Sequence, residues 1–321
     1  MKIIFMGTPT FAAESLDAIL KSSHEVVAVC TQPDRPAGRG HKLTASPVKE
    51  LAAAHGLPIF QPETLRFSDE NAKKVREELE EFGADIFVVA AYGLLLPKGV
   101  LTMPPLGCVN VHASLLPKYR GASPIHAAIL NGDAATGITI IHMDAGLDTG
   151  DMILQKRLEI GADERFAELH DRMAVLGAEA ICEALAQLEN GTAARVVQDN
   201  ALASHAPKLQ KSDGRIDWSD SSEKIFNQVR ALACFTQRDG QVIKIWDVEK
   251  STDDSFREQF PGVSKKFSPG EIISAEKGLL VKTGDGAIRI TELQAVGKKR
   301  MPASDFLRGQ RVGVSDRFRW V

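Results

Sequence analysis

Patterns that would bind a metal ion through cysteine or histidine are missing from this sequence. The eight histidines are dispersed, without an HxH or HExxH arrangement. The four cysteines are scattered and form no CxxC pair; they are Cys30, Cys108, Cys182 and Cys234. A thiolate zinc site and a disulfide framework both need more closely organised cysteines, so neither is expected. We therefore expect no bound metal ion.

Long apolar runs are missing too. The longest, such as 86–92, are far shorter than the roughly 20 residues that cross a bilayer. Met1 and Lys2 lead directly into an apolar run, with no basic leader followed by a signal-type stretch and no arginine-rich transit peptide. We therefore expect a cytoplasmic protein that does not contact a membrane.

The glycine patterns of nucleotide-binding loops are also absent. Gly7 follows the first predicted strand, but the turn 7–12 lacks the second and third glycines of GxGxxG. Without them the backbone could not approach a pyrophosphate as that pattern requires. The GxxxxGK[ST] loop is not found either. These absences speak against NAD binding and against a P-loop nucleotide site.

What is present in the first half is an alternation of strands and helices. The chain of 321 residues is long enough for two domains, and its 44% hydrophobic and 25% charged residues are typical of a globular protein. Predicted strands cover 2–6, 25–30, 86–91, 107–112 and 137–143, and predicted helices cover 11–20, 47–56, 68–82 and 165–188. Such alternation predicts an α/β domain, Rossmann-like, whose mostly parallel sheet carries helices on both faces.

The second half has short alternating runs separated by turns. They cover 241–248, 270–275, 279–283 and 287–293, after one helix at about 223–232, and Gly284–Gly286 is a hairpin signal. We predict a smaller, OB-like β-barrel. The expected domains are 1–191 and 208–321, joined by a linker at 192–207. Residues 1–205 carry a net charge of -8 and the remainder +5, which is compatible with different partners or with ordinary surface scatter.

Two polar side chains share one face of a predicted core strand. Side chains two apart on a strand point the same way, so Asn110 and His112 face one side while Val109 and Val111 face the other. Ligands of open α/β sheets bind at the carboxyl ends of strands, where His112 lies. An amide can stabilise an oxyanion and an imidazole can move protons, which suits acyl transfer. Taken alone, the pair favours buried groups that satisfy each other or the backbone over a catalytic role.

The surrounding residues give the pair a context. The stretch "NVHASLLPKYRGASPIHAAIL", followed by "MDAGLDTGDMI", closely resembles the folate-dependent formyltransferase family. The resemblance implies transfer of a formyl group from N10 of tetrahydrofolate to an amine. It also implies that Asn110, His112 and Asp148 are the catalytic residues. Residues along the formyl-folate would be Ser114, Leu115, Leu116 and Pro117.

Other parts of the site are less specified. Both Asp144 and Asp148 lie in the same loop, an aspartate before Thr-Gly is commonly a turn former, and the residues alone do not choose between them. Cys108 shares the strand face with Asn110 and is interpreted as a core residue. Walls for the pterin of 10-formyltetrahydrofolate are expected from a strand with its exit turn and from a second loop: Val88, Ala90, Tyr92, His142 and Asp144.

The acceptor is indicated by two basic regions. The loop 31–49 resembles the insertion with which the methionyl-tRNA branch of the family reaches the acceptor stem, and Arg39 would be its main contact. The segments 206–219 and 293–309 resemble that branch's tail, with a departure at 230–237, where a proline- and tryptophan-containing turn is more usual. Candidate RNA contacts are Arg35, Arg39, Lys42, Lys298, Lys299 and Arg300. The expected partners are initiator methionyl-tRNA and a reduced folate, with the protein a monomer.

Three alternatives remain open from the residues. One is a sugar-amine formyltransferase, and another is a formyl-folate hydrolase that uses water. Neither would explain the basic loop together with the basic tail. The third is a tRNA-binding protein with an inactive first domain, against which the intact Asn110, His112 and Asp148 speak.

Overall fold

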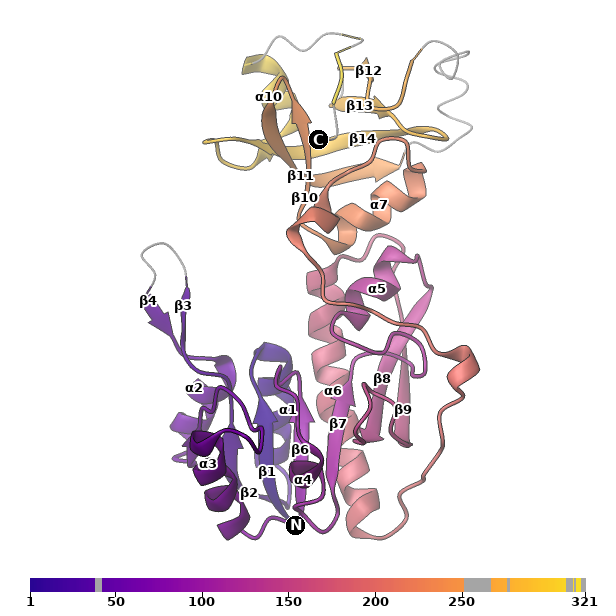
Figure 1. Ribbon diagram of the computed structural model, residues 1–321. Coiled ribbons are helices and arrows are strands. Elements are labelled where there is room, and N and C mark those ends of the chain that lie inside the picture. Colours follow the sequence, from indigo (N-terminus) through magenta and orange to yellow (C-terminus); the bar gives the residue numbers. More distant parts are fainter. Residues whose placement is uncertain (38–41, 251–266, 276–277, 310–313, 315, 319–321) are drawn as a thin grey trace. The chain divides into compact units, whose positions relative to one another are not determined.

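The computed structural model describes residues 1–37, 42–250, 267–275, 278–309, 314 and 316–318 (Figure 1). The chain divides into two compact units. The first comprises Met1–Ile125, Ala134–Ile160 and Ala167–Pro207, and the second comprises His126–Asp133, Gly161–Phe166 and Lys208–Val321. The segment 192–207, predicted to be a linker, therefore belongs to the first unit. We call it the connector below.

A seven-stranded sheet is the centre of the first unit. Its order is β5-β2-β1-β6-β7-β8-β9. The bounds are β1 (Lys2–Gly7), β2 (Glu25–Cys30), β5 (Ile59–Phe60), β6 (Ile86–Ala90), β7 (Cys108–His112), β8 (Ala135–His142) and β9 (Met152–Glu159). The strands from β5 to β7 pair in parallel. β8 pairs antiparallel with β7, and β9 pairs antiparallel with β8. The mostly parallel sheet is confirmed, but β9 was not predicted because its exposed face carries alternating charges.

Helices cover both faces of this sheet, as predicted. They are α1 (Thr10–Leu20), α2 (Pro47–Ala54), α3 (Glu70–Glu81), α4 (Lys98–Leu101) and α6 (Phe166–Glu189), whereas α5 (Pro124–Leu130) falls mostly in the second unit. On one face, Gly177 of α6 packs against Val111 of β7 and Phe11 of α1. On the other, Leu79 of α3 and Val100 of α4 belong to one core cluster with strand residues including Cys108.

Local signals explain where two of these helices begin. The side chain of Ser46 accepts a hydrogen bond from the backbone N–H of Lys49, and Pro47 is the first helical residue of α2, as predicted. The start of α3 differs from the prediction by one residue. Its cap is Asp69, whose carboxylate accepts from the N–H of Ala72, in place of Ser68.

The basic loop 31–49 contains a hairpin that was not predicted. Strands β3 (Arg35–Ala37) and β4 (Lys42–Thr44) form a separate two-stranded antiparallel sheet, visible in Figure 1. Three residues per strand are too few for an alternating pattern to be recognised in a segment rich in glycine and proline. The base of the hairpin is held by Asp34, whose carboxylate accepts bonds from Lys49 and Gln61.

The second unit is built on an antiparallel sheet. The strands are β10 (Cys234–Arg238), β11 (Gln241–Lys250), β12 (Ile272–Ser274), β13 (Leu279–Lys282), β14 (Ala287–Ala295) and β15 (Met301–Pro302), and the helices are α7 (Ser222–Ala231) and α10 (Ala303–Gly309). The order β10-β11-β14-β13-β12, with β15 beside β14, makes a curled half-barrel as predicted for this part. Its core includes Trp218, Phe226, Ile288 and Phe306. The departing segment 230–237 leads directly from the end of α7 into β10.

Short 3-10 turns complete the secondary structure, η1 (Asn200–Leu202) in the connector and η2 (Lys211–Gly214) in the second unit. Within the described ranges, no helix is both long and apolar enough to cross a membrane.

Candidate active site

The paired polar residues lie on β7, between parallel β6 and antiparallel β8. Asn110 is opposite Val89 of β6 and Ile141 of β8, and His112 is opposite Thr139. Asn110 is half-buried, and no described residue hydrogen-bonds to its side-chain amide. The predicted core role of Cys108, further down the same face, agrees with its position. The residue is 2% exposed, and burial raises the pKa of its thiol to about 12.

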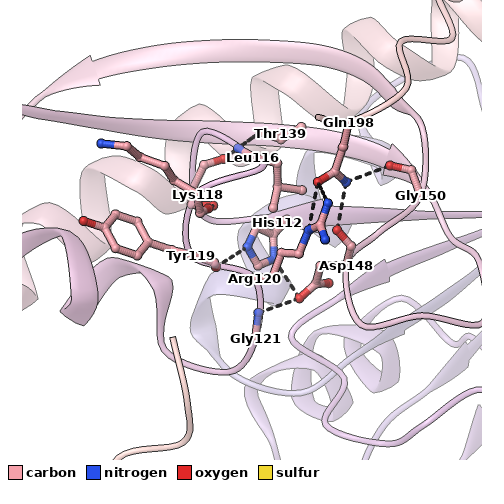
Figure 2. Close-up of polar contacts among 11 residues, drawn as sticks. His112, Leu116, Lys118, Tyr119, Arg120, Gly121, Thr139, Asp148, Gly150 and Gln198 are labelled. Carbon is pink, nitrogen blue, oxygen red and sulfur yellow. Dashed lines mark hydrogen bonds and ion pairs between the residues drawn. The ribbon is translucent and has the colours of Figure 1, made fainter. Parts of the chain in front are cut away.

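His112 is held at both ring nitrogens, as Figure 2 shows. Its Nε2 lies 2.9 Å from the backbone carbonyl of Tyr119. A carbonyl can only accept, so Nε2 carries the hydrogen. Its Nδ1 lies 3.6 Å from Oδ2 of Asp148, within ion-pair range and longer than a direct hydrogen bond. The side chains are 5% and 14% exposed, so water screens this contact little.

The structure distinguishes the two aspartates of the loop after β8. The Oδ2 atom of Asp148 accepts a 2.8 Å bond from the backbone N–H of Gly121 and faces His112. By contrast, Asp144 is exposed and accepts bonds from Gly146 and Thr149 of its own loop. The turn-forming role that the sequence left open for both residues therefore belongs to Asp144, and Asp148 is the one beside the imidazole.

Backbone strain gathers around these side chains. Among the described non-glycine residues with positive φ are Ala91 at 43°, Tyr119 at 62° and Asp148 at 54°. Ala91 follows β6 directly, Tyr119 supplies the carbonyl that binds His112, and Asp148 supplies the carboxylate. Such conformations cost about 1–3 kcal/mol each and persist where the surroundings impose them, which is typical of functional sites.

Two buried residues behind Asp148 were missed by the sequence analysis. The guanidinium of Arg120 donates to Oε1 of Gln198 from Nε at 3.0 Å and from Nη2 at 2.8 Å. The Nε2 atom of Gln198 in turn donates to the backbone carbonyls of Asp148 and Gly150, both at 2.8 Å (Figure 2). Nothing in the sequence marked Gln198, because a glutamine in a polar connector is ordinary. Arg120 was visible within the family-like stretch but had no assigned role.

The segment Ser114–Pro117 is anchored to the sheet by its alternate residues. Ser114 and Leu116 are buried, and their backbone groups bond to the hydroxyl of Thr139. Gln155 of β9 donates to the carbonyl of Leu116 at 2.8 Å. Leu115 and Pro117 are half-buried. Of the four residues predicted to line the folate, these two have side chains with exposed surface.

Most of the other residues predicted to border the folate have buried side chains, so they could contact it mainly through their backbone. Val88 and Ala90 are fully buried in β6, and the ring of Tyr92 is 2% exposed. The carbonyl of Tyr92 accepts from Thr8 and Gln32. His142 is half-buried, and burial, then the charge of Arg195, lowers its pKa, with Asp151 opposing.

The predicted RNA contacts fall into different environments. In the hairpin, Arg35 is exposed, Lys42 lies in β4, and Arg39 lies outside the described residues. Lys49, a further basic residue of the loop, is engaged by Asp34 at 2.7 Å, and the bond from Lys49, then that from Gln61, lowers the pKa of Asp34.

The basic residues of the C-terminal tail divide in the same way. Lys298 and Lys299 are exposed between β14 and β15. Arg300 is bonded to Glu292 and lies over the ring of Trp246 at 5.2 Å. Arg308 is paired with Asp305, and Arg311 lies outside the described residues.

Comparisons with known proteins agree with this geometry. Residues 1–185 match the family model "Formyl transferase", and residues 208–311 match "Formyl transferase, C-terminal domain". Together these models span most of the chain, and the chain therefore belongs to the formyl transferase family.

The chain's full-length relatives are more specific. It is 45% identical to a methionyl-tRNA formyltransferase of Ruminiclostridium cellulolyticum, over 99% of both chains. It is 47% identical to one of Pseudomonas putida, over 97% of this chain and 96% of the relative. Among solved structures, an N-formyltransferase of Helicobacter canadensis in complex with folinic acid and dTDP-3-aminofucose has a TM-score of 0.66. At 19% identity over 92% of this chain and 99% of the other, that similarity concerns the fold alone.

Proposed function

We propose that this protein transfers the formyl group of 10-formyltetrahydrofolate to the amino group of initiator methionyl-tRNA. The observation that carries the proposal is similarity to methionyl-tRNA formyltransferases along nearly the whole chain, the C-terminal unit included. The basic hairpin and the exposed lysines between β14 and β15 are compatible with an RNA-borne acceptor.

Direct attack of the amine fits the groups at the site. The neutral amine adds to the formyl carbon and gives a tetrahedral centre with an oxyanion. Asn110, whose amide is half-exposed and not bonded by described protein groups, is placed on β7 to donate to that oxygen. No covalent enzyme intermediate is required, and the buried thiol of Cys108, with its raised pKa, is not a nucleophile.

The proton balance is assigned to His112 and Asp148. The attacking nitrogen loses a proton and the departing folate nitrogen gains one. The imidazole, with Asp148 beside Nδ1 and Tyr119 on Nε2, can carry one proton between these two atoms. A substrate oxygen that binds Nε2 must displace the Tyr119 carbonyl or share the hydrogen with it.

The folate is proposed to lie at the carboxyl end of β6 and against the loop after β8. Backbone groups of Val88, Ala90 and Tyr92 suit a pterin, which offers several donors and acceptors. His142 and Asp144 border the opposite side, and Leu115 with Pro117 flank the formyl group. Phosphates of the tRNA are assigned to Arg35, Arg39 and Lys42 of the hairpin, and to Lys298 and Lys299. Arg300 is a weaker candidate because Glu292 already engages it.

The domain boundaries 1–191 and 208–321 are retained as functional units of the proposal. Residues 192–207 remain the linker between these functional units, and they pack with the first unit. The protein is proposed to act in the cytoplasm, because charged tRNA is used where proteins are made. It is also proposed to be a monomer. Light scattering at several concentrations tests the monomer.

Formyl transfer from labelled 10-formyltetrahydrofolate distinguishes the alternatives. Label should move to charged initiator tRNA and not to uncharged tRNA or to a sugar amine. Label on the sugar amine indicates the sugar-amine alternative, and formate released without an acceptor indicates a hydrolase. Binding of tRNA without any transfer indicates an inactive binding protein. Each of the last three results would contradict the proposed function.

A further inference from the structure

The connector contacts the loop that holds His112 and Asp148. The hydroxyl of Ser204 accepts from the N–H of Tyr119 at 3.0 Å, and Tyr119 is the residue whose carbonyl binds the imidazole. Ala206 pairs with Arg120 through its N–H at 2.8 Å and accepts from the N–H of Ser123. A segment predicted to be a linker therefore hydrogen-bonds, largely through its backbone, to the loop that carries the active-site contacts.

Close approach of the connector explains the glycine beside Asp148. Gly121 has φ +117°, a conformation open to glycine, and a Cβ there would lie 2.7 Å from the carbonyl oxygen of Ala206. The same residue donates its N–H to Asp148. The position of this donor is thus set by how the connector packs.

Gln198 is a connector residue that hydrogen-bonds directly to Asp148. It is 5% exposed, and the orientation of its amide is unambiguous. A guanidinium can only donate, so Oε1 must face Arg120, and carbonyls can only accept, so Nε2 must face Asp148 and Gly150. Arg120 is itself 5% exposed and is fixed further by Oδ1 of Asn200 at 2.8 Å.

We propose that Gln198 is a positioning residue that holds Asp148 in its left-handed conformation, and with it the carboxylate against His112. The inference rests on the proposed function. Asp148 has φ +54°, which costs free energy for a residue with a Cβ. The amide of Gln198, oriented by the charge of Arg120, donates two hydrogen bonds to the carbonyls on either side of Thr149, and these bonds offset that cost. Without them the loop relaxes, and the carboxylate moves away from Nδ1.

The sharpest test is Gln198→Glu, which replaces the amide by a group of nearly the same shape. The carboxylate keeps Arg120 as a partner, so the fold is retained, but it repels the two carbonyls that Gln198 binds. We expect kcat for formyl transfer to fall about tenfold or more, because small displacements of catalytic groups cost this much. KM for tRNA and for folate should stay within about twofold of wild type.

A double-mutant cycle with Asp148→Asn shows whether the effect passes through Asp148. Gln198→Glu should cause no further loss of kcat in the Asp148→Asn background, since the carboxylate is already gone. An equal loss in both backgrounds, or an unchanged kcat in the single variant, would overturn the inference. Val197→Thr, at a neighbouring position that is 78% exposed, is the control and should leave kcat unchanged.

Two other outcomes are distinguishable. If Gln198→Glu does not fold, Gln198→Met, which keeps the length and removes both donor bonds, takes its place in the cycle. Failure of both variants to fold would overturn the inference in favour of a purely structural role. Failure of the proposed function would appear separately, as Asp148→Asn with wild-type kcat or as wild-type protein that does not formylate methionyl-tRNA.

Discussion

His112 is a side chain that the folded chain holds in one orientation. One ring nitrogen is bonded to a carbonyl 2.9 Å away, and the other faces a carboxylate at 3.6 Å, with both side chains largely buried. The carbonyl fixes which nitrogen holds the hydrogen, and the carboxylate lies beside the other nitrogen. The neighbouring Asn110 has no such restraint among the described residues, so its amide remains available to a developing oxyanion.

Replacing Asn110 or His112 by alanine should lower turnover by roughly a hundredfold or more, because each removes a donor or a proton carrier in the transition state. The tRNA affinity should stay nearly intact, since neither side chain is assigned to RNA. Single-turnover rates and filter binding measure the two quantities. Wild-type turnover in either variant would refute the assignment of that residue.

His142 should make stability depend on pH. Burial lowers its pKa, so the folded state favours the neutral ring. The unfolded chain, with a histidine pKa of about 6.5, binds more protons below that pH. The stability contribution is complete above pH 6.5 and is lost as pH falls towards and through the lowered folded value.

Urea denaturation of wild type and His142→Gln at several pH values checks this prediction. The free energy of unfolding of the wild type should fall relative to that of the variant as pH drops below about 6.5. Parallel curves for the two proteins would show that His142 does not titrate differently on folding.

The hairpin β3–β4 is an element held at its base by polar side chains. Arg35 is exposed at its start, and Arg39 lies outside the described residues between its strands. The base depends on Asp34, which binds Lys49 at 2.7 Å and Gln61 at 2.9 Å. Basic residues of this loop therefore contribute in two ways, either as candidate phosphate contacts or as anchors that hold the hairpin.

Lys49→Ala should raise KM for tRNA several-fold while leaving KM for folate unchanged, because it loosens the base of the hairpin. Amides at 35, 37 and 42–44 should exchange faster with solvent, since the anchoring bond to Asp34 is gone. Lys74→Ala removes an exposed ion pair on α3 and is the matched control. Unchanged exchange in Lys49→Ala would contradict the anchoring role.

Two basic regions, one in each unit, are assigned to the same RNA. The net charge of the whole chain is -3, so attraction to phosphate must come from local groups. The side chains of Lys298 and Lys299 are exposed, and neither ammonium group forms an ion pair with a described residue. Arg300 shares its charge with Glu292. The exposed lysines should therefore carry more of the salt-dependent affinity than the arginine.

The salt dependence of tRNA binding should show that difference. Lys298→Ala and Lys299→Ala should each reduce the slope of log affinity against log salt by about 0.7–0.9, the value for one lost phosphate contact. Arg300→Ala should change the slope less. Equal slopes in wild type and all three variants would remove the assigned role of these residues.

Much of this molecule follows from local patterns in its sequence. The alternation of apolar strands and amphipathic helices predicted the α/β unit, and short runs with turn signals predicted the antiparallel second unit. Asn110 and His112 were recognisable because a two-residue spacing places both side chains on one strand face. The cap of α2 at Ser46 and Pro47 was predicted as well.

The remaining features depend on contacts between residues far apart in the chain. Neither the choice of Asp148 over Asp144 nor the role of Gln198 has a local signal, because each follows from which backbone groups meet in the folded protein. The same holds for Lys49, because the sequence does not indicate that its ammonium group pairs with Asp34 in the folded protein. Local patterns specify elements and the faces they bury, whereas hydrogen bonds between distant segments specify which polar groups converge on the reacting atoms.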